Sequence, residues 1–468
     1  MDLTRREFAA GALTLAAACG PREPGATPGI VNDITQLNPI RVAQIAEPRS
    51  ADDVAALIAD HAGPISIGGG RFSQGGQTAC DNALFIDMRA LNRILRIDAE
   101  ARMVTVESGV TWRQIQEAAD PLGLSPAIMQ SFCNFTVGGS LSVNCHGDYV
   151  GLGPVIESVR SIRVVMADGS IRTASRTENT SLFRAAIGGY GGVGAIIEAT
   201  LDLAENTKLE RLTHRMRVGD YVAWHRASVL RREDMVLHHA VIYPDAYTNI
   251  AAEVATRTGK PLTIEDRLSP MGPPTAVERS VLDAITHSPA GPFIHERIYD
   301  PLTTRPAVVW RNYEAARDAY SLEPASRDRV TYVLQEYFVP VARFSAFVTR
   351  MAEIFRTHNA NVLNVSIRHT RADPLSLLAW AFEEVYSFVI YYAQATTDEA
   401  RAAVGVWTRA LVDAAVAEGG SYYLPYQIHA TPEQFRAAYP HADQYFAVKR
   451  RLDPTYKFRN RLLEAYYR

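Results

Sequence analysis

Two glycine-rich segments, about seventy residues apart, carry residue types suited to holding a large anionic ligand. The first, residues 65–77, is a short apolar run followed by three consecutive glycines. The second, residues 135–147, contains a Gly-Gly pair and ends in His146-Gly147. Glycines adopt positive φ and leave their amides exposed, and successive exposed N–H groups form a concave site for an anion such as a pyrophosphate. Either segment alone is explained as well by a tight structural turn, but the occurrence of both favours the anion site.

A third glycine-rich segment matches the G-x-G-x-x-G pattern at Gly189, Gly191 and Gly194. A dinucleotide-binding fingerprint of that form follows a strand and opens a helix. Here the glycines follow a predicted helix, residues 181–187, and precede a predicted strand, residues 195–203. The segment is therefore not a Rossmann fingerprint.

The elements that must position these loops alternate irregularly between helix and strand. Ser50 is a predicted helix cap followed by early acids, and residues 111–119 form a predicted amphipathic helix. Residues 64–67, 83–87 and 103–108 are predicted strands, and residues 161–166 and 171–174 a hairpin. Because the order is mixed rather than a strict strand–helix alternation, we expect an α+β fold.

The composition of the chain changes after about Glu205: charged residues become more frequent, and aromatic runs replace the glycine loops. Residues 335–340 and 388–393 are such runs, and residues 343–358 and 397–418 are predicted helices. A length of 468 residues allows two sizeable cores. We expect this part to be a second unit.

Composition excludes several other classes of protein. The formal net charge is −3 and there is no basic block, which argues against a nucleic-acid partner. Four cysteines in this length are no disulfide framework, and their spacing is not that of metal ligands, so we expect no metal.

The N-terminus has the pattern of an export signal. A twin-arginine segment, Thr4-Arg5-Arg6-Glu7-Phe8, precedes a small apolar run, residues 9–18, and then Cys19. That run is shorter than the about 20 apolar residues that a spanning helix needs. We expect twin-arginine export to the periplasm, the alternative being a chance Arg-Arg pair. Lipidation of Cys19, which would anchor the protein to a membrane, stays open. Residues 20–33 are Pro- and Gly-rich and are predicted to be a linker.

The two glycine segments together resemble the FAD-binding domain of the vanillyl-alcohol oxidase superfamily, also called PCMH-type. The resemblance runs over about residues 38–203 and reappears at the C-terminus. The sugar and polyol oxidoreductases are most similar: aldonolactone, alditol and decaprenylphosphoryl-ribose oxidases. The resemblance implies a two-subdomain PCMH-type FAD-binding domain, residues 34–206, and an α+β substrate or cap domain, residues 207–430. Residues 1–33 are then signal and linker, and residues 431–468 return to the FAD domain.

The resemblance implies that FAD lies against all three glycine segments, held mostly by backbone amides and small side chains. The residues implied are Gly68, Gly69, Gly70, Arg71, Phe72, Ser73, Gln77, Thr136, Gly138, Gly139, Ser140, Asn144, His146, Gly147, Gly191, Val193, Gly194 and Ile196, with Asn460 from the C-terminal return.

The first loop departs from many relatives, which carry a histidine that bonds covalently to the flavin. Phe72 stands at that position and cannot form the bond. We therefore expect non-covalent FAD. Linkage through Cys133 is the alternative, because some relatives use a cysteine close to this place. The plainer interpretation of Cys133 and Cys145 is that of small buried side chains.

The resemblance also implies substrate-side residues in the second unit. Glu336 stands in a segment similar to the E-[YF]-x-V-P element of alditol and lactone oxidases, and Arg368 matches their active-site arginine. Tyr391 lies in the following aromatic run. Tyr426 and His429 fall where these relatives have a P-H-W-x-K run, so that His429 replaces a lysine.

These residue types suit the oxidation of an alcohol, which needs a proton acceptor near the hydroxyl as hydride leaves. A neutral histidine such as His429 can take that proton, and Glu336 and Arg368 can bond to hydroxyls or stabilise a developing alkoxide. The alternative is a structural Glu336–Arg368 ion pair and a surface His429. His146 is a structural residue, a cofactor contact or a base.

The function implied is that of an exported FAD-dependent oxidoreductase. It would oxidise a C–OH group of a sugar, polyol or related alcohol by hydride transfer to flavin N5. Oxygen or another acceptor would reoxidise the flavin. One alternative is oxidation of a lipid-linked sugar in cell-envelope synthesis, and another is a flavin-binding lipoprotein without turnover.

Overall fold

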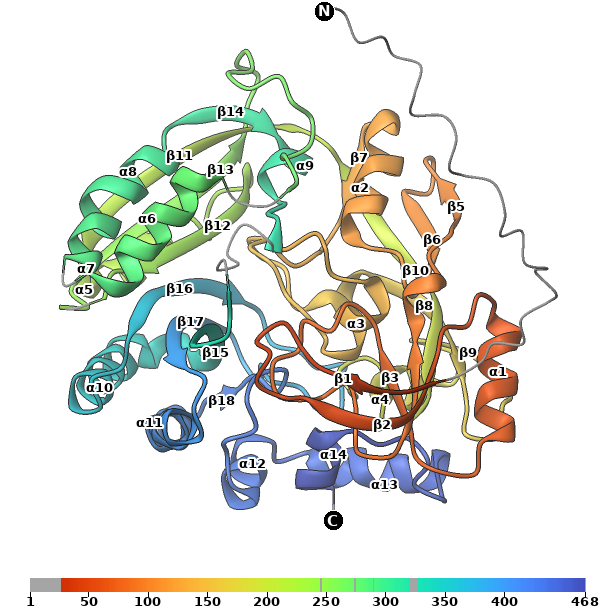
Figure 1. The fold of residues 1–468 in the computed structure, drawn as a ribbon. Helices are drawn as coiled ribbons and strands as arrows, with labels where there is room; N and C mark the ends of the chain where they lie inside the picture. Colours follow the sequence, from red (N-terminus) through yellow and green to blue (C-terminus); the bar gives the residue numbers. More distant parts are fainter. Residues whose placement is uncertain (1–26, 245, 273–274, 289, 320–325, 468) are drawn as a thin grey trace, which may run out of the picture.

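The computed structural model describes residues 27–468, apart from residues 245, 273–274, 289, 320–325 and 468. Three β-sheets make up its framework, two on the right of Figure 1 and the third on the left. The mixture of helices and sheets agrees with the expected α+β class. The twin-arginine segment and Cys19 lie outside the described residues. Residues 27–31, expected to be linker, instead form β1, because they pair with β2 along the edge of the first sheet.

The first sheet carries the first glycine loop. Its strand order is β1-β2-β4-β3, with bounds β1 Thr27–Val31, β2 Ile40–Ala46, β3 Ile65–Gly68 and β4 Leu84–Asp87. Helix α1, Ala51–Asp60, begins at the predicted cap, where the Ser50 side chain accepts from Asp53 N. Strand β3 ends at Gly68, so the chain leaves the sheet directly into the loop.

The second sheet has six strands and carries the other two glycine segments. Its order is β5-β6-β10-β8-β9, with β7 on β10; the bounds are β5 Ile94–Asp98, β6 Met103–Glu107, β7 Leu124–Pro126, β8 Val159–Val165, β9 Ile171–Ser175 and β10 Ala195–Glu205. Its helices are α2 Trp112–Ala119, α3 Val137–Ser142 and α4 Thr180–Ala186. The third glycine segment does connect a helix, α4, to a strand, β10, as predicted.

The third sheet has eight antiparallel strands and carries the predicted substrate side. Its order is β14-β11-β13-β12-β16-β17-β15-β18; the bounds are β11 Lys208–Arg217, β12 Met235–Ile242, β13 Asn249–Arg257, β14 Ala307–Trp310, β15 Val330–Pro340, β16 Val362–Thr370, β17 Val385–Ala395 and β18 Ser421–Tyr422. Its helices are α5 Val218–Ser228, α6 Ala276–His287, α7 Gly291–Ile294, α8 Asp300–Thr303, α9 Arg311–Glu314, α10 Phe344–Thr357 and α11 Asp398–Ala417.

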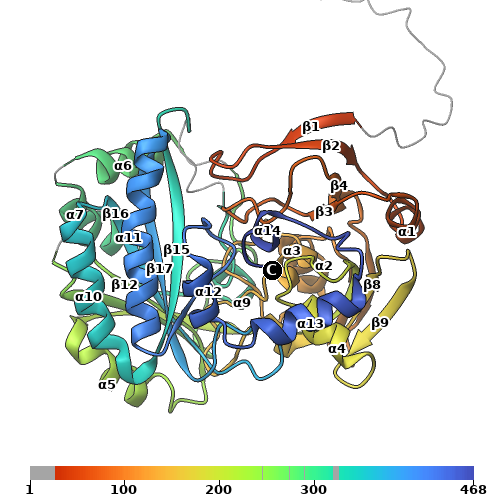
Figure 2. The same cartoon turned by 90° about the horizontal axis from the view of Figure 1, so that it is seen from below.

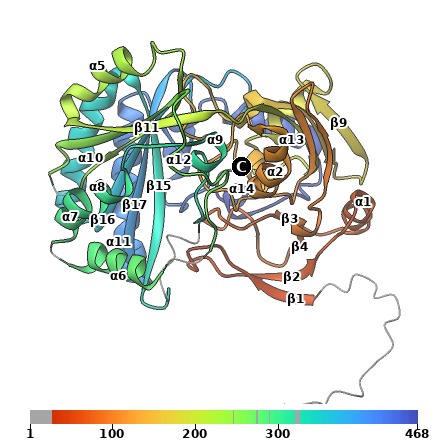
Figure 3. The same ribbon diagram turned by 90° about the horizontal axis from the view of Figure 1, so that it is seen from above.

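Helices α10 and α11 cover the outer face of β15 and β17, away from the first two sheets (Figures 2 and 3). Tyr337 of β15 packs against Phe347 of α10, and Tyr392 of β17 against Trp407 of α11. Since successive side chains of a strand point to opposite faces, Leu334 and Glu336 project from β15 toward the inner face. That face looks toward the glycine loops.

The C-terminal helices α12 Pro432–Ala438, α13 Ala442–Leu452 and α14 Arg461–Tyr466 follow the third sheet. Helix α13 packs beside α4, on the side of the first two sheets (Figure 2). Phe458 forms a parallel bridge with Ile65 at the start of β3. The buried ammonium of Lys449 donates to the carbonyls of Gly192 and Phe458 at 2.7 and 2.9 Å. Through Lys449, the C-terminal region thus holds the third glycine segment in place. Within the described residues, no helix is both long and apolar enough to cross a membrane.

Candidate active site

The three glycine segments and the inner face of the third sheet line one cavity. It encloses about 1320 Å³ of empty space, its open mouth included. Gly68, Thr136 and Gly191 line it from the three segments, and Glu336 and Arg368 line it from β15 and β16.

Part of the cavity wall is backbone without side chains, because glycines there pack closely against neighbouring residues. Such a wall can lie against a flat ligand. A Cβ added to Gly138 would lie 2.7 Å from Ser108 Cβ and 3.1 Å from the Ser108 carbonyl, so only glycine fits there. Gly191 has a φ of +70°, a conformation that L side chains rarely adopt. Thr136 caps α3 by accepting from Gly139 N at 3.4 Å. These features fit a large dinucleotide that lies close to backbone.

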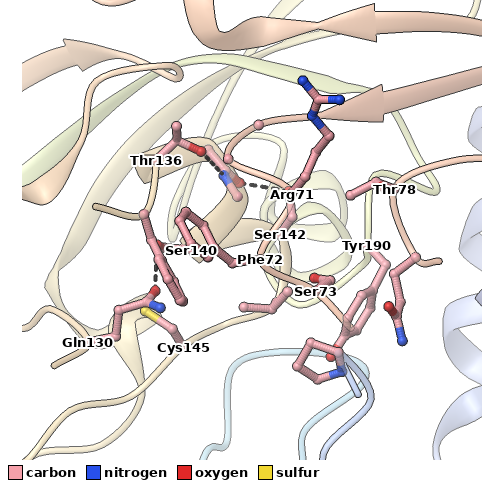
Figure 4. A pocket seen from close by; sticks show the side chains of 18 of the residues that line it. Arg71, Phe72, Ser73, Thr78, Gln130, Thr136, Ser140, Ser142, Cys145 and Tyr190 are labelled. Carbon is pink, nitrogen blue, oxygen red and sulfur yellow. Dashed lines mark hydrogen bonds between the residues drawn. The ribbon is translucent and has the colours of Figure 1, made fainter. Parts of the chain in front are cut away.

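Figure 4 shows how side chains of the cavity wall are held. The Ser140 hydroxyl donates to Gln130 Oε1 at 2.6 Å and accepts from Trp112 Nε1 at 2.9 Å. Arg71 extends toward Asp87, and the closest nitrogen and oxygen are 3.5 Å apart. The polar wall is therefore fixed by its own hydrogen bonds before any ligand arrives.

Most of the residues predicted to bind FAD line this cavity. They are Gly68, Gly69, Gly70, Arg71, Phe72, Ser73, Gln77, Thr136, Gly138, Gly139, Ser140, His146, Gly191, Gly194 and Ile196. The cavity thereby brings together residues from all three glycine segments.

Four residues predicted to bind FAD are not among the lining residues, and each has a structural role instead. The Asn144 amide donates to Asp373 Oδ2 at 2.8 Å. Gly147 is packed against a backbone carbonyl, and Val193 is fully buried in the core. Asn460 donates to the Tyr190 carbonyl at 2.7 Å and caps α14. These residues shape the loops rather than the cavity wall.

Phe72 lies inside the cavity and stacks on Phe135, with ring centroids 4.0 Å apart. Cys133 is not a lining residue; its Sγ lies 3.3 Å from the Arg317 carbonyl, and burial raises the pKa of its thiol to about 11. Cys145 does line the cavity, and burial raises the pKa of its thiol to about 12. Neither thiol is poised as a thiolate.

The first glycine loop is also fastened to the third sheet. The Gln77 side chain donates to the carbonyls of Leu424 and Tyr426 at 2.7 and 2.6 Å. The Gln74 side chain accepts from Leu334 N of β15 at 2.7 Å. The predicted cofactor residue Gln77 therefore also fixes the distance between the loop and the substrate side.

Glu336 is buried at the centre of a hydrogen-bond network. His146 Nε2 lies 2.6 Å from Glu336 Oε1, and the Ser387 hydroxyl donates to the same oxygen at 2.7 Å. The Tyr426 hydroxyl donates to Glu336 Oε2 at 3.2 Å. Among described residues, none pairs with His146 Nδ1. The network joins the second glycine segment to β15 and β17 across about 190 residues of sequence.

Two opposing effects set the ionisation of Glu336. Burial alone would raise its pKa, but the charge and hydrogen bond of His146, the charge of Arg368 and the Ser387 hydrogen bond outweigh burial and lower it. Glu336 is therefore a carboxylate at neutral pH, able to accept hydrogen bonds or a proton.

Arg368 lines the cavity beside this network and pairs with a residue that the sequence did not single out. Its Nε lies 2.8 Å from Asp148 Oδ1, whereas Glu336 forms no ion pair with Arg368 and acts on it only through its charge. The alternative of a Glu336–Arg368 ion pair is thus not what the structure shows. Asp148 directly follows His146-Gly147, so its position next to a cofactor motif was a usable signal.

Tyr391 and His429 lie outside the cavity. Tyr391 stacks on Tyr332, with centroids 5.5 Å apart, in the apolar cluster under α6. His429 is half-buried beside Gly405 of α11, and desolvation lowers its pKa to about 4. The expectation that these two side chains reach the reacting centre does not hold in this structure. Tyr426, three residues before His429, occupies the cavity instead.

Several lining residues gave no signal in the sequence. Tyr190 lies within the third glycine segment, between two glycines of the motif, and is not itself a motif residue. The others are apolar or amide side chains without a motif, such as Gln130, Leu334, Val389 and Tyr423. Only the strand pairing of β15 with β17 and the loop contacts bring them together.

Comparisons with known proteins agree with this geometry. A family model described as FAD binding domain matches residues 42–175. Decaprenylphosphoryl-beta-D-ribose oxidase of Mycolicibacterium smegmatis is 36% identical over 143 residues, 30% of this chain and 31% of that protein. L-gulonolactone oxidase of Mus musculus is 29% identical over 149 residues, 32% and 34% of the two chains. Cytokinin dehydrogenase 3 of Arabidopsis thaliana is 27% identical over 180 residues, 36% and 34%.

The chain thus spans about a third of the length of the curated relatives that it matches. The match covers the first two glycine segments and the strands that carry them. The resemblance inferred from the sequence is confirmed over this part: residues 42–175 are an FAD-binding domain, similar to those of PCMH-type FAD oxidoreductases, and FAD is its cofactor.

Proposed function

We propose that this protein is an FAD-dependent oxidoreductase that oxidises a C–OH group of a sugar, polyol or related alcohol. One observation carries the proposal. The cavity that the FAD loops line continues to Glu336 and Arg368 on the third sheet and to Tyr426 in the loop after β18. A cofactor site and a set of hydroxyl-binding side chains therefore share one enclosed space.

Bound flavin would supply the chemistry of the redox step by accepting hydride from the substrate carbon. The protein's part is to orient the alcohol and to accept its proton. His146 Nε2 lies 2.6 Å from Glu336 Oε1, and Glu336 Oε2 remains able to receive the hydroxyl proton. The lowered pKa keeps this carboxylate unprotonated at neutral pH, and Tyr426 and Ser387 hold its orientation.

Arg368 supplies donors on the other side of the network. Its side chain lines the cavity, and its ion pair with Asp148 engages Nε. In an enclosed site these donors stabilise negative charge that develops on a hydroxyl oxygen. We assign the hydroxyl oxygen to Arg368 and the hydroxyl proton to Glu336.

The proposal includes dissociable FAD and an electron acceptor that is oxygen or another oxidant. Phe72 supports dissociable FAD because it occupies the cavity without a bondable atom. We also propose that the twin-arginine segment exports the folded protein to the periplasm. The fate of Cys19 would decide whether a lipid anchors it there.

The test is anaerobic reduction of the FAD-loaded protein by a panel of sugars, polyols and lactone-forming sugars. We expect at least one of them to bleach the flavin absorption, and admission of air or an added dye to restore it. Bound FAD that no member of the panel reduces, although dithionite does, would favour a flavin-binding protein without turnover.

A specific observation favours a second candidate, the oxidation of a lipid-linked sugar. Large apolar side chains are exposed together around helices α6 and α8: Val277, Phe293 and Leu302 are 72%, 61% and 55% exposed, and Met271 and Ile298 are also exposed. Soluble proteins rarely gather such side chains without a binding role. The inner side of α6 contacts Tyr332, two residues from the lining residue Leu334.

We propose that this apolar surface carries a hydrocarbon chain, because α6 also contacts β15, the strand that bears Glu336. The test compares methyl and dodecyl glycosides of one sugar as reductants of the flavin. A lipid-linked substrate predicts a lower KM for the dodecyl compound, and Val277→Ser with Phe293→Ser should remove that advantage alone. Equal KM values for both glycosides would leave only the free sugar or polyol.

A further inference from the structure

Asp148 stands behind Arg368 and is held from three directions. Its Oδ1 lies 2.8 Å from Arg368 Nε, and its Oδ2 accepts from the Ser131 hydroxyl at 3.1 Å. Its carbonyl accepts from His238 N of β12 at 2.8 Å. Asp148, which directly follows the second glycine segment, is therefore attached to strands β12 and β16 of the third sheet and to Ser131. These contacts fix the position of its carboxylate.

The charges at this end of the cavity do not sum to a positive value. Burial would raise the pKa of Asp148, but the charges of Arg368, protonated His239 and Arg317 and the Ser131 bond lower it to about 2. Glu336 is likewise ionised. His239, 3.9 Å from Asp148, has a pKa lowered by burial to about 3 and is neutral. The two carboxylates, Asp148 and Glu336, are thus balanced by the two guanidiniums of Arg368 and Arg317, and the formal charges sum to zero.

An arginine without such a partner is a strong site for carboxylate or phosphate, because its planar fork bonds both oxygens of an anion. The Arg368 side chain lines the cavity, and Asp148 is the carboxylate within ion-pair distance of it among the described residues, so an anion in the cavity could reach the guanidinium. The charge balance is what opposes it.

We propose that Asp148 is a specificity-determining residue: by pairing with Arg368 it cancels the guanidinium charge, so that the cavity selects uncharged hydroxyl groups and rejects carboxylates and phosphates at this position. The inference rests on the proposed function, since it names the class of substrate group that Arg368 receives. It concerns binding at Arg368 and needs no turnover to be tested.

The experiment titrates the FAD-loaded protein with sodium acetate and follows the perturbation of the flavin spectrum at constant ionic strength. Four proteins are compared: wild type, Asp148→Asn, the double variant Asp148→Asn with Arg368→Gln, and Asp98→Asn. The last is the matched control, because Asp98 pairs with Arg96 on an exposed strand and its loss changes the net charge equally. Glycerol serves as the uncharged probe.

We expect Asp148→Asn to bind acetate at least tenfold more tightly than wild type, with no comparable gain for glycerol. The double variant and Asp98→Asn should behave as wild type. Inorganic phosphate should reproduce the acetate result if the site fits it. Unchanged acetate affinity in Asp148→Asn would overturn the proposal.

A second measurement covers the case in which Asp148→Asn fails to fold or to hold FAD. The wild-type protein should show no saturable acetate binding at concentrations where glycerol perturbs the spectrum. Saturable acetate binding to wild type that Arg368→Gln abolishes would contradict the proposal without any Asp148 variant. If these results hold but no alcohol reduces the flavin, the proposed function fails and the assignment of Asp148 stands.

Discussion

Glu336 is the residue on which the proposed chemistry depends most. It is buried, ionised and bonded to His146, Ser387 and Tyr426. Asn or Gln at such a position keeps the size of the side chain and removes its ability to accept a proton. The rate of the redox step should therefore separate the carboxylate's chemical role from its packing.

For Glu336→Gln we expect the rate of anaerobic flavin reduction to fall by about 10²–10⁴-fold, the usual contribution of a positioned base. FAD affinity should stay close to that of wild type. Stopped-flow absorption measures both. The matched control is Glu384→Gln, because Glu384 also bonds a histidine, His369, but is half-exposed at the end of β17. A reduction rate within threefold of wild type would remove Glu336 from the mechanism.

At the residue scale, the sequence predicted which residues line the cavity better than it predicted which residues they pair with. Glu336 and Arg368 lie in the cavity as the resemblance implied, although their catalytic roles stay predictions. His429 does not, since the chain turns after Tyr426 and places His429 against Gly405 of α11. Asp148 was missed although it directly follows His146-Gly147, because its partner Arg368 lies 220 residues further along the chain.

At the scale of elements, the glycine turns decide how closely a cofactor can approach. Gly138 opens helix α3 against Ser108. For Gly138→Ala we expect overpacking of about 1–3 kcal/mol. FAD affinity should fall about tenfold or more, because the shifted helix narrows the cavity. FAD titration and thermal unfolding measure the two effects.

Gly219→Ala is the control for this change. Gly219 lies in helix α5, and an added Cβ would meet nothing within 4 Å. Alanine should be neutral or slightly stabilising there. If Gly138→Ala binds FAD as tightly as Gly219→Ala does, the glycine wall is not the binding surface.

Helix α5 and the outer face of the third sheet enclose a cluster of histidines. His225 of α5 lies 4.7 Å from His238 and 5.0 Å from His369, measured between ring centroids. Burial lowers the pKa of His225 to about 2 and that of His238 to about 4. In the unfolded chain both have a pKa near 6.5, so the unfolded state binds more protons below that pH.

Stability contributed by these neutral histidines should thus be complete above about pH 6.5 and be lost as the pH falls toward 4. As the pH falls from 6.5 to 4.5, the free energy of unfolding should decrease less steeply in His225→Phe than in wild type. The two slopes should differ by up to about 1.4 kcal/mol per pH unit. Urea unfolding at several pH values measures the slope. Glu253 and the other titrating groups are common to both proteins. Identical slopes would mean that His225 is already charged in the fold.

Most elements could be predicted from the sequence because local signals agree with the fold. The Ser50 cap begins α1, the Thr397 cap begins α11, and the turn after Val165 joins β8 to β9. Strand β1 was missed because its glycine and proline suggested a linker. Its pairing with β2, which no local pattern encodes, makes it a strand.

At the scale of the whole molecule, segments of all three sheets and their loops line one cavity. The sequence did not predict how the sheets meet, since that depends on contacts such as those of Gln77 with residues 424 and 426 and of Lys449 with Gly192. The boundaries after residues 33, 206 and 430 stay predictions. The eight-stranded sheet does begin at Lys208, two residues past the second of them.

The central claim is that this cavity holds FAD without a covalent bond. The most direct measurement is the visible absorption spectrum of the purified protein before and after acid precipitation. We predict a flavin spectrum that moves completely to the supernatant, because Phe72 offers no atom for a bond and the thiols of Cys133 and Cys145 stay protonated. Colour that stays in the pellet would contradict dissociable FAD, and a colourless protein that takes up no added FAD would contradict the cavity's assignment.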